Sequence, residues 1–234
     1  MIENSYQNLF KLPELKRKIF ITLALLFVYR VGIHVPTPGV DGAALSSFFA
    51  SAQGTLFSMF NMFSGGALER FSIFALGIMP YISASIILEL MTVVVPHLAQ
   101  LKKEGDAGRK KKTQYTRYGT VLLSIIQGLG ISVGLESMTS PAGVAIVPYP
   151  GWAFRLVTII TLTAGTSFIM WLGEQITERG IGNGISLIIF AGIVAQMPSA
   201  MGNTIRLMTT GEMGIFLLII LIVLMVAVIA AIIY

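Results

Sequence analysis

Long apolar stretches alternate with short polar ones along most of the chain. A membrane-spanning helix needs about 20 predominantly apolar residues, and five stretches approach or reach that length. A shorter stretch, Ile185–Met197, is flanked by glycines and by Pro198, and we expect a helix at 184–201 there. The pattern therefore predicts an all-α, polytopic membrane helix bundle with six crossings. The five longer stretches are Ile19–Ile33, Phe71–Val95, Tyr118–Leu135, Trp152–Leu172 and Met213–Tyr234.

The composition places most of the chain in lipid. Of its 234 residues, 55% are hydrophobic and 12% are charged, whereas a soluble domain carries about 25% charged residues. The absence of cysteine excludes disulfides, thiolate nucleophiles and cysteine metal sites. His34 and His97 are too far apart to suggest a metal cluster, so we expect neither a metal nor another cofactor. The first twenty residues are charged where a signal peptide has its apolar core, so we expect no cleavable leader.

Two clusters of basic residues set the expected orientation. Short loops rich in Lys and Arg stay in the cytoplasm. One cluster lies within residues 1–18 and the other in the loop 96–117, so we expect both segments, and the N-terminus, on the cytoplasmic side. The loop also suits an acidic partner or an RNA surface, although the orientation rule already explains most of it. Its basic residues are Lys102, Lys103, Arg109, Lys110, Lys111, Lys112 and Arg117.

A further apolar segment, Leu56–Phe63, is too short to cross the membrane. If it crossed, the two basic clusters would lie on opposite sides, so we expect it to enter the bilayer and return. Its Met and Phe side chains suit a surface that must release and repack, and Gly65 and Gly66 offer a hinge after it. An amphipathic helix in the external interface fits the composition equally well. The candidate residues are Leu56, Phe57, Met59, Phe60, Met62 and Phe63.

Isoleucines at helical spacing and one mid-helix amide are candidates for a path through the membrane. Ile78 and Ile82 stand four residues apart and share one helix face, as do Ile185 and Ile189. Branched aliphatics that meet at a centre form a constriction that excludes water, but ordinary packing produces this spacing far more often. Gln127 lies within an apolar helix, where an amide needs a partner or a wet cavity. A helix–helix contact is its more common role.

Four longer segments follow one another along the chain: FSMFNMFSGGAL, SIFALGIMPYISASII, KKEGDAGRKKKTQYTRYG and MWLGEQITERGIGNGISLIIFAGI. Together with RVGIHVPTPGV, they resemble the bacterial SecY family, whose members form the channel of the Sec translocon. The resemblance covers essentially the whole chain and about the first half of the family. The last apolar stretch ends at Tyr234 without a following Lys or Arg, so we expect a piece of a longer protein.

The resemblance implies a ten-helix channel built from two inverted five-helix halves. Residues 1–18 then form the cytoplasmic N-terminus, 19–212 the N-terminal half and 213–234 the sixth transmembrane helix. Residues 55–65 match the plug, a short helix that does not span. Ser83 and Gln127 match positions at the lateral gate. The positions of the hydrophobic pore ring match Ile78, Ile82, Ile185 and Ile189.

The resemblance also implies a function and a set of partners. Members of the family translocate unfolded polypeptides across the bacterial inner membrane and release hydrophobic segments sideways into lipid. The implied partners are the SecE and SecG subunits, the SecA motor ATPase, the ribosome and polypeptides that bear a signal sequence. Membrane lipid and the C-terminal half of the same protein complete the set, and no enzymatic activity is implied for the chain.

Two other function classes explain the sequence less well. A secondary transporter of a small solute would account for the kinked, glycine-flanked helices, but it needs charged or ion-binding residues at the midplane. The helix centres offer only Gln127 and hydroxyl groups. An intramembrane hydrolase needs a nucleophile beside a histidine, or paired aspartates in the membrane. Asp41 and Asp106 fall in predicted loops, so we do not expect an enzyme.

Overall fold

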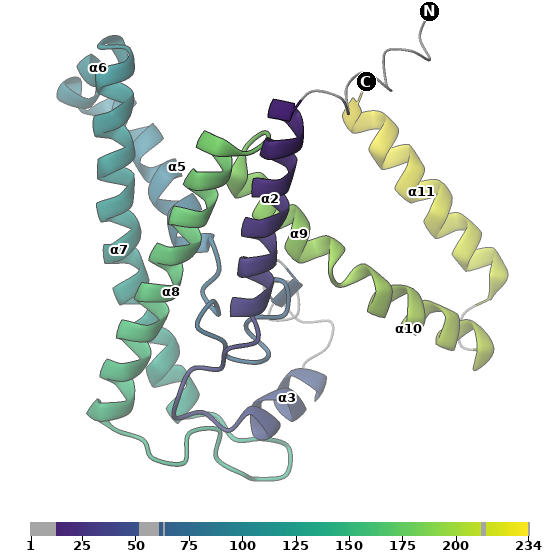
Figure 1. Cartoon of the computed structure of the whole chain (residues 1–234). Coiled ribbons are helices and arrows are strands. Elements are labelled where there is room, and N and C mark those ends of the chain that lie inside the picture. The colour runs from purple at the N-terminus through teal and green to yellow at the C-terminus, as the bar shows by residue number, and fades with distance from the viewer. Residues whose placement is uncertain (1–12, 52–60, 63, 212–213, 234) are drawn as a thin grey trace, which may run out of the picture. The chain divides into compact units, whose positions relative to one another are not determined.

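The computed structural model describes residues 13–51, 61–62, 64–211 and 214–233. Within these residues the secondary structure is helical, with two isolated β-bridges and no strand, which confirms the all-α class. The chain divides into two compact units, Met1–Ile193 and Val194–Tyr234. The helices (Figure 1) are α2 (Pro13–Gly32), α3 (Gly42–Ser51), α5 (Met79–Val94), α6 (Pro96–Lys103), α7 (Asp106–Glu136), α8 (Trp152–Arg179), α9 (Gly184–Val194), α10 (Met197–Thr209) and α11 (Ile215–Ile233).

The antiparallel helices α7 and α8 form the longest packed pair of the first unit (Figure 1). At Gly128 of α7, an added Cβ atom would lie 3.5 Å from the Cα atom of Ile159 on α8. Helices in lipid are held together largely by close van der Waals contact, which small side chains permit. The buried residues of α7 are accordingly almost all small and recur mostly every four residues: Gly108, Thr116, Thr120, Ser124, Gly128 and Ser132.

The prediction of one helix over Phe71–Val95 is wrong at its start. The helix begins only at Met79, and residues 64–78 form a succession of turns. Phe71 has a φ of 42° and Gly77 a φ of 57°, and neither value is compatible with a right-handed helix. The apolar run therefore begins before the helix does, and its residues 71–78 are not helical.

Backbone partners on other segments explain how this apolar stretch can be non-helical. The N–H group of Thr37 donates to the carbonyl oxygen of Phe71 at 2.8 Å, and the N–H group of Ile73 donates to that of Val35 at 2.9 Å. Buried backbone polar groups must be satisfied somewhere, and here the segment after α2 satisfies them. Hydropathy cannot distinguish this arrangement from a helix, because both bury the same side chains.

Several predicted boundaries also shift. α7 begins at Asp106 rather than at Tyr118, and α8 continues to Arg179 rather than ending at Leu172. The predicted basic loop 96–117 is consequently mostly helical, with α6 in its first part. Hydropathy marks only the apolar part of a helix, and polar turns extend both helices beyond it.

The predicted helix 184–201 is divided. α9 ends at Val194, and α10 starts at Met197 with Pro198 in its first turn. Proline lacks an N–H group, so it disrupts a helix interior but fits the first turn, whose N–H groups have no intrahelical partner. A further helix, α3, lies between two of the predicted apolar stretches.

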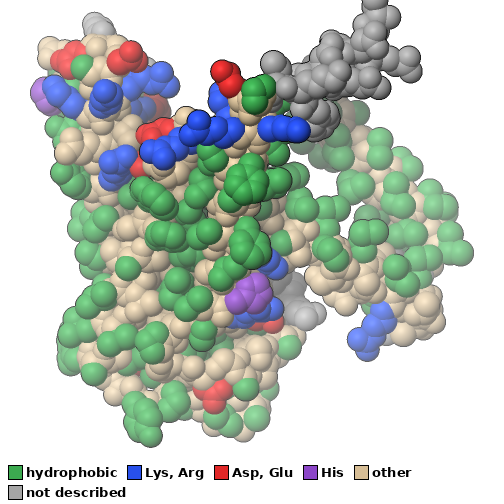
Figure 2. All heavy atoms as spheres, in the orientation of Figure 1, with side chains coloured by type: hydrophobic (Ala, Val, Ile, Leu, Met, Phe, Trp, Pro, Cys, Tyr) green, Lys and Arg blue, Asp and Glu red, His purple; other side chains and the backbone are tan. Residues whose placement is uncertain are grey.

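Four segments among the described residues are long and apolar enough to cross a membrane, which confirms the multi-pass membrane class. α2 is not among them because it carries Lys16, Arg17, Lys18 and Arg30, and α5 is too short with 16 residues. The six crossings therefore remain a prediction. Most Lys and Arg side chains of the first unit gather at one end of its helices (Figure 2). The four segments are Asp106–Glu136, Trp152–Arg179, Gly184–Thr209 and Ile215–Ile233.

Candidate pore, plug and gate residues

The four predicted pore isoleucines share one hydrophobic cluster. Ile78 is buried in this cluster, and Ile82, Ile185 and Ile189 are partly buried against it. The structure thus brings together two isoleucine pairs, one at the start of α5 and one on α9, that are distant in the sequence. The other buried members, from α2, the turns before α5, α8 and α9, are Tyr29, Ile33, Ala67, Phe74, Ile169, Leu172, Ile176 and Ile188.

The turn between α8 and α9 positions the second isoleucine pair. The Oδ1 atom of Asn183 accepts hydrogen bonds from the N–H groups of Ile185 at 3.0 Å and Ser186 at 3.3 Å, and so caps α9. An added Cβ atom on Gly184 would lie 2.0 Å from the carbonyl oxygen of Gly173 on α8. The start of α9 is therefore fixed by a direct contact between the two backbones.

A row of stacked aromatic rings fixes the turns that lead into α5. The Phe74 ring lies between Tyr29 of α2 and Phe168 of α8, with ring centroids 5.9 and 6.1 Å away, and Phe168 stacks on Trp171 at 5.6 Å. Such pairs contribute about 0.5–1.5 kcal/mol each beyond the area they bury. The row places Ile78 and was not predicted, because its rings come from three separate segments without a common spacing.

Of the eleven residues of the predicted plug 55–65, seven lie outside the described residues, namely 55–60 and 63. Of the six apolar candidates, only Met62 is described, and its side chain is exposed. The other five predicted residues, about which the structure offers no test, are Leu56, Phe57, Met59, Phe60 and Phe63.

The last two residues of the predicted plug, Ser64 and Gly65, are held by contacts with α2 and α9. The guanidinium Nη1 of Arg30 donates to the carbonyl oxygen of Gly65 at 3.0 Å, and the hydroxyl of Tyr29 donates to that of Ser64 at 3.4 Å. An added Cβ atom on Gly65 would lie 3.1 Å from the Cα atom of Gly192 on α9. These residues are therefore held between α2 and α9. Neither Arg30 nor Tyr29 was predicted to have this role.

The two predicted gate residues are half-buried and lie at different levels of the bundle. Ser83 is on α5 and Gln127 on α7. The two helices touch where an added Cβ atom on Gly119 would lie 3.3 Å from the Cβ atom of Ala84. Gln127 is then about 12 Å further along the axis of α7, at 1.5 Å per residue. The structure places both residues on neighbouring helices but does not bring their side chains together.

Several residues of the predicted basic loop are paired with carboxylates. Lys112 is hydrogen-bonded to Glu89 of α5, and the Nζ of Lys111 lies 3.6 Å from the Oε2 of Glu104. The side chains of Lys102 and Lys103 are not described. Arg117 makes the best-defined pair, because its Nε and Nη2 bond both carboxylate oxygens of Glu174 at 2.8 and 2.7 Å.

The fold and these residues define a helical multi-pass membrane protein whose helices and turns converge on a buried aliphatic and aromatic cluster. The SecY family model matches residues 72–234, and the chain belongs to this family. This assignment removes the basis for the small-solute transporter hypothesis.

Bacterial relatives extend the match. The protein translocase subunit SecY of Buchnera aphidicola subsp. Acyrthosiphon kondoi is 55% identical over 209 residues, which are 89% of this chain and 58% of the relative. The subunit from Escherichia coli K12 is 54% identical over 209 residues, 89% of this chain and 47% of the relative. The subunit from Aquifex aeolicus is 47% identical over 207 residues, which are 88% of this chain and 48% of the relative. The chain spans about half the length of the curated relatives it matches.

Two solved structures share the fold. They are described as Sec61 in the canine ribosome-channel complex from the endoplasmic reticulum and as a protein conducting channel. Each has a TM-score of 0.54 and 19% sequence identity, and each match covers 78% of this chain and 37% of the other. At this identity the likeness concerns the fold alone.

Proposed function

We propose that the chain is the N-terminal half of a protein-conducting channel in the bacterial inner membrane. Residues 19–212 would form this half, and 213–234 would be the sixth transmembrane helix of a ten-helix whole. Membership of the SecY family is the observation that carries the proposal. The convergence of two isoleucine pairs on one hydrophobic cluster agrees with it.

The pore ring follows from what a passing polypeptide requires. A channel that admits any side chain cannot use a rigid filter. Ile78, Ile82, Ile185 and Ile189 offer no hydrogen bonds to the passenger, and branched aliphatics close around it and exclude water, which limits ion leakage. Ile78 is buried and the other three are partly buried, so the ring is supported by a packed cluster on one side. The C-terminal half would supply the opposite wall.

The lateral gate is the route by which apolar segments of the passenger would enter lipid. Each charge costs about 2.5–3.5 kcal/mol at the membrane centre, whereas Leu and Ile partition favourably. Ser83 and Gln127 on α5 and α7 would line this route at two depths. Their polarity would let water and passenger backbone contact the gate while it is open.

The proposed orientation has the N-terminus and residues 96–117 in the cytoplasm. The gathering of basic side chains at one end of the helices supports it. On that side the channel would meet the SecA motor ATPase or the ribosome, which supply the driving force, and polypeptides that bear a signal sequence. The SecE and SecG subunits and the C-terminal half would complete the assembly within membrane lipid.

Resting ion conductance tests the plug assignment. The full-length protein would be reconstituted with its partner subunits in planar bilayers. Deletion of residues 55–65 should raise the resting conductance, because the segment proposed to close the channel at rest is then missing. Deletion of residues 141–145, which are all exposed, serves as the control for a shortened loop elsewhere in the chain. An unchanged resting conductance after removal of 55–65 would contradict the assignment.

Replacement of ring residues tests the pore. The triple variant I78S/I82S/I189S should increase ion leakage while a polypeptide is in transit, because hydroxyl groups hold water where the isoleucines exclude it. Conductance with an arrested passenger measures this leakage. The matched control, I86S/I87S/I160S, changes three isoleucines that are exposed and outside the cluster. Equal leakage from both variants would remove the isoleucines from the ring.

A further inference from the structure

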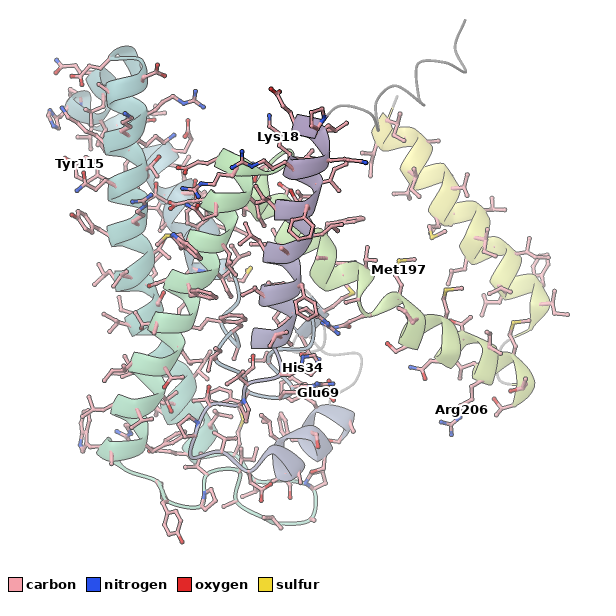
Figure 3. The ribbon with its side chains drawn as sticks, viewed as in Figure 1. Lys18, His34, Glu69, Tyr115, Met197 and Arg206 are labelled. Carbon is pink, nitrogen blue, oxygen red and sulfur yellow. The ribbon has the colours of Figure 1, made fainter. Side chains whose placement is uncertain are left out.

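The helix α10 has a polar stripe on one side and an apolar stripe on the other. The polar stripe consists of Ser199, Asn203 and Arg206, which recur at intervals of four and three residues and therefore share one face. Met197 and Met201 begin the apolar stripe on the opposite face. Met197 and Arg206 accordingly project from opposite sides of α10 (Figure 3). A helix with two such faces separates a wet environment from an apolar one.

The polar stripe falls within the depth of the membrane. The segment Gly184–Thr209 is long and apolar enough to cross. At 1.5 Å per residue its 26 residues extend up to about 39 Å, whereas the hydrocarbon core is about 30 Å thick. If this span is centred on the membrane, Ser199 and Asn203 lie inside the core and Arg206 lies at its edge. In the proposed orientation this edge is the external one.

Two side chains of the stripe need a partner that α10 does not supply. The hydroxyl of Ser199 donates to the carbonyl oxygen of Gln196 at 2.8 Å, within the same turn. The side chains of Asn203 and Arg206 have no hydrogen-bond or ion-pair partner within the part of the chain that the structure describes. An amide or a guanidinium is too costly to leave unsatisfied in hydrocarbon. Water or another polypeptide must therefore lie beside them.

The spacing of the polar stripe continues through the sequence to two residues of the proposed pore ring. Intervals of four and three residues alternate along the whole series, which is the spacing of a single helix face. The series is apolar at its start and polar at its end, as expected of a path that is closed at one level and wet beyond it. Its members are Ile185, Ile189, Gly192, Gln196, Ser199, Asn203, Arg206 and Thr210.

We propose that the polar stripe of α10 contacts the passenger polypeptide in a water-filled external half of the channel, and that Arg206 favours acidic segments of the passenger there. The proposal rests on the proposed channel function. The amide of Asn203 both donates and accepts, as an extended backbone requires, and Arg206 is a fixed positive charge. A passenger carboxylate about 6 Å from this charge in water is favoured about threefold over an uncharged side chain.

Reaction with a membrane-impermeant maleimide tests whether the stripe is wet. In the cysteine-free full-length protein with its partner subunits, S199C and N203C should react from outside, because a thiolate forms only in contact with water. The matched variants M201C and I205C lie at similar depth on the apolar stripe, where both native side chains are 61% exposed in this chain, and they should not react. Unreactive stripe cysteines, or equal reaction on both stripes, would overturn the proposal.

Disulfide cross-linking to an arrested passenger tests the contact and the role of Arg206. Two passengers, each with one cysteine, differ only in an Asp or a Lys beside it. The acidic passenger should cross-link to N203C about ten times as often as the basic one, since attraction and repulsion each contribute about threefold. R206E should invert this preference. R70E makes the same charge change at an exposed position outside α10 and should leave the preference unchanged.

The outcomes separate this inference from the channel function. If the complex translocates polypeptide but N203C cross-links to neither passenger, the stripe does not contact the passenger and the channel function stands. A helix lying flat on the membrane would give this result despite a reactive stripe. If R206E and R70E have the same effect, Arg206 has no special role. If the complex translocates no polypeptide, the channel function and the inference that rests on it both fail.

Discussion

At the scale of single residues, Gly165 determines how closely the turns before α5 approach α8. An added Cβ atom there would lie 1.8 Å from the carbonyl oxygen of Ile73, which is backbone and cannot rotate away. G165A should therefore destabilise the protein by about 1–3 kcal/mol, as overpacking does in well-packed cores. The thermal unfolding midpoint of the purified full-length protein in detergent measures the effect.

A matched glycine provides the control for this substitution. Gly130 lies in α7 with no atom within 4 Å of an added Cβ, and alanine is the better helix former. G130A should leave the unfolding midpoint unchanged or raise it. If G165A and G130A behave alike, the turns do not need the contact at Gly165, and the conformation of 64–78 has another cause.

At the scale of elements, α7 and α8 are tied at both ends by arginine–carboxylate pairs of opposite arrangement. Arg117 of α7 bonds Glu174 of α8, and Glu136 of α7 bonds Arg155 of α8 at 2.6 and 3.0 Å. R117E should lower the unfolding midpoint, and R117E/E174R should restore part of it. The coupling should be about 1 kcal/mol or less, because the Arg117 side chain is half exposed and water screens it.

The salt dependence of this coupling provides a further check. An exposed pair loses most of its interaction at 1 M salt, where the Debye length is about 3 Å. The double-mutant cycle should therefore give a smaller coupling at high salt. A coupling of zero at low salt would show that the pair does not stabilise the hairpin.

An element could be predicted from the sequence where its conformation is determined by neighbouring residues, and not where distant segments determine it. The start of α8 at Trp152 and the apolar core of α11 follow from hydropathy and flanking residues, and both were predicted. The turns at 64–78 were not predicted, because their backbone groups bond partly to a distant segment, as Phe71 does to Thr37. The isoleucine pairs could be proposed because a spacing of four residues is a local signal, although Ile78 lies at the N-cap of α5 and not within the helix.

At the scale of the whole molecule, the distribution of basic residues predicts which segments share a side of the membrane. The segment 52–63 separates two exposed positions, Ser46 and Arg70. If that segment enters the bilayer and returns, both positions lie outside; if it crosses, they lie on opposite sides. Since this chain contains no cysteine, single cysteines introduced into a cysteine-free full-length protein report on each position separately.

Labelling of spheroplasts with a membrane-impermeant maleimide distinguishes the two topologies. S46C and R70C should both react in intact spheroplasts, as should Y149C, which replaces a side chain that is 87% exposed. K110C, on the predicted cytoplasmic side, should react only after permeabilisation. Reaction of S46C but not R70C would mean that 52–63 crosses. It could not then be a plug, and every later helix would be inverted, so the basic segment 96–117 would face outward against the rule that predicted the orientation.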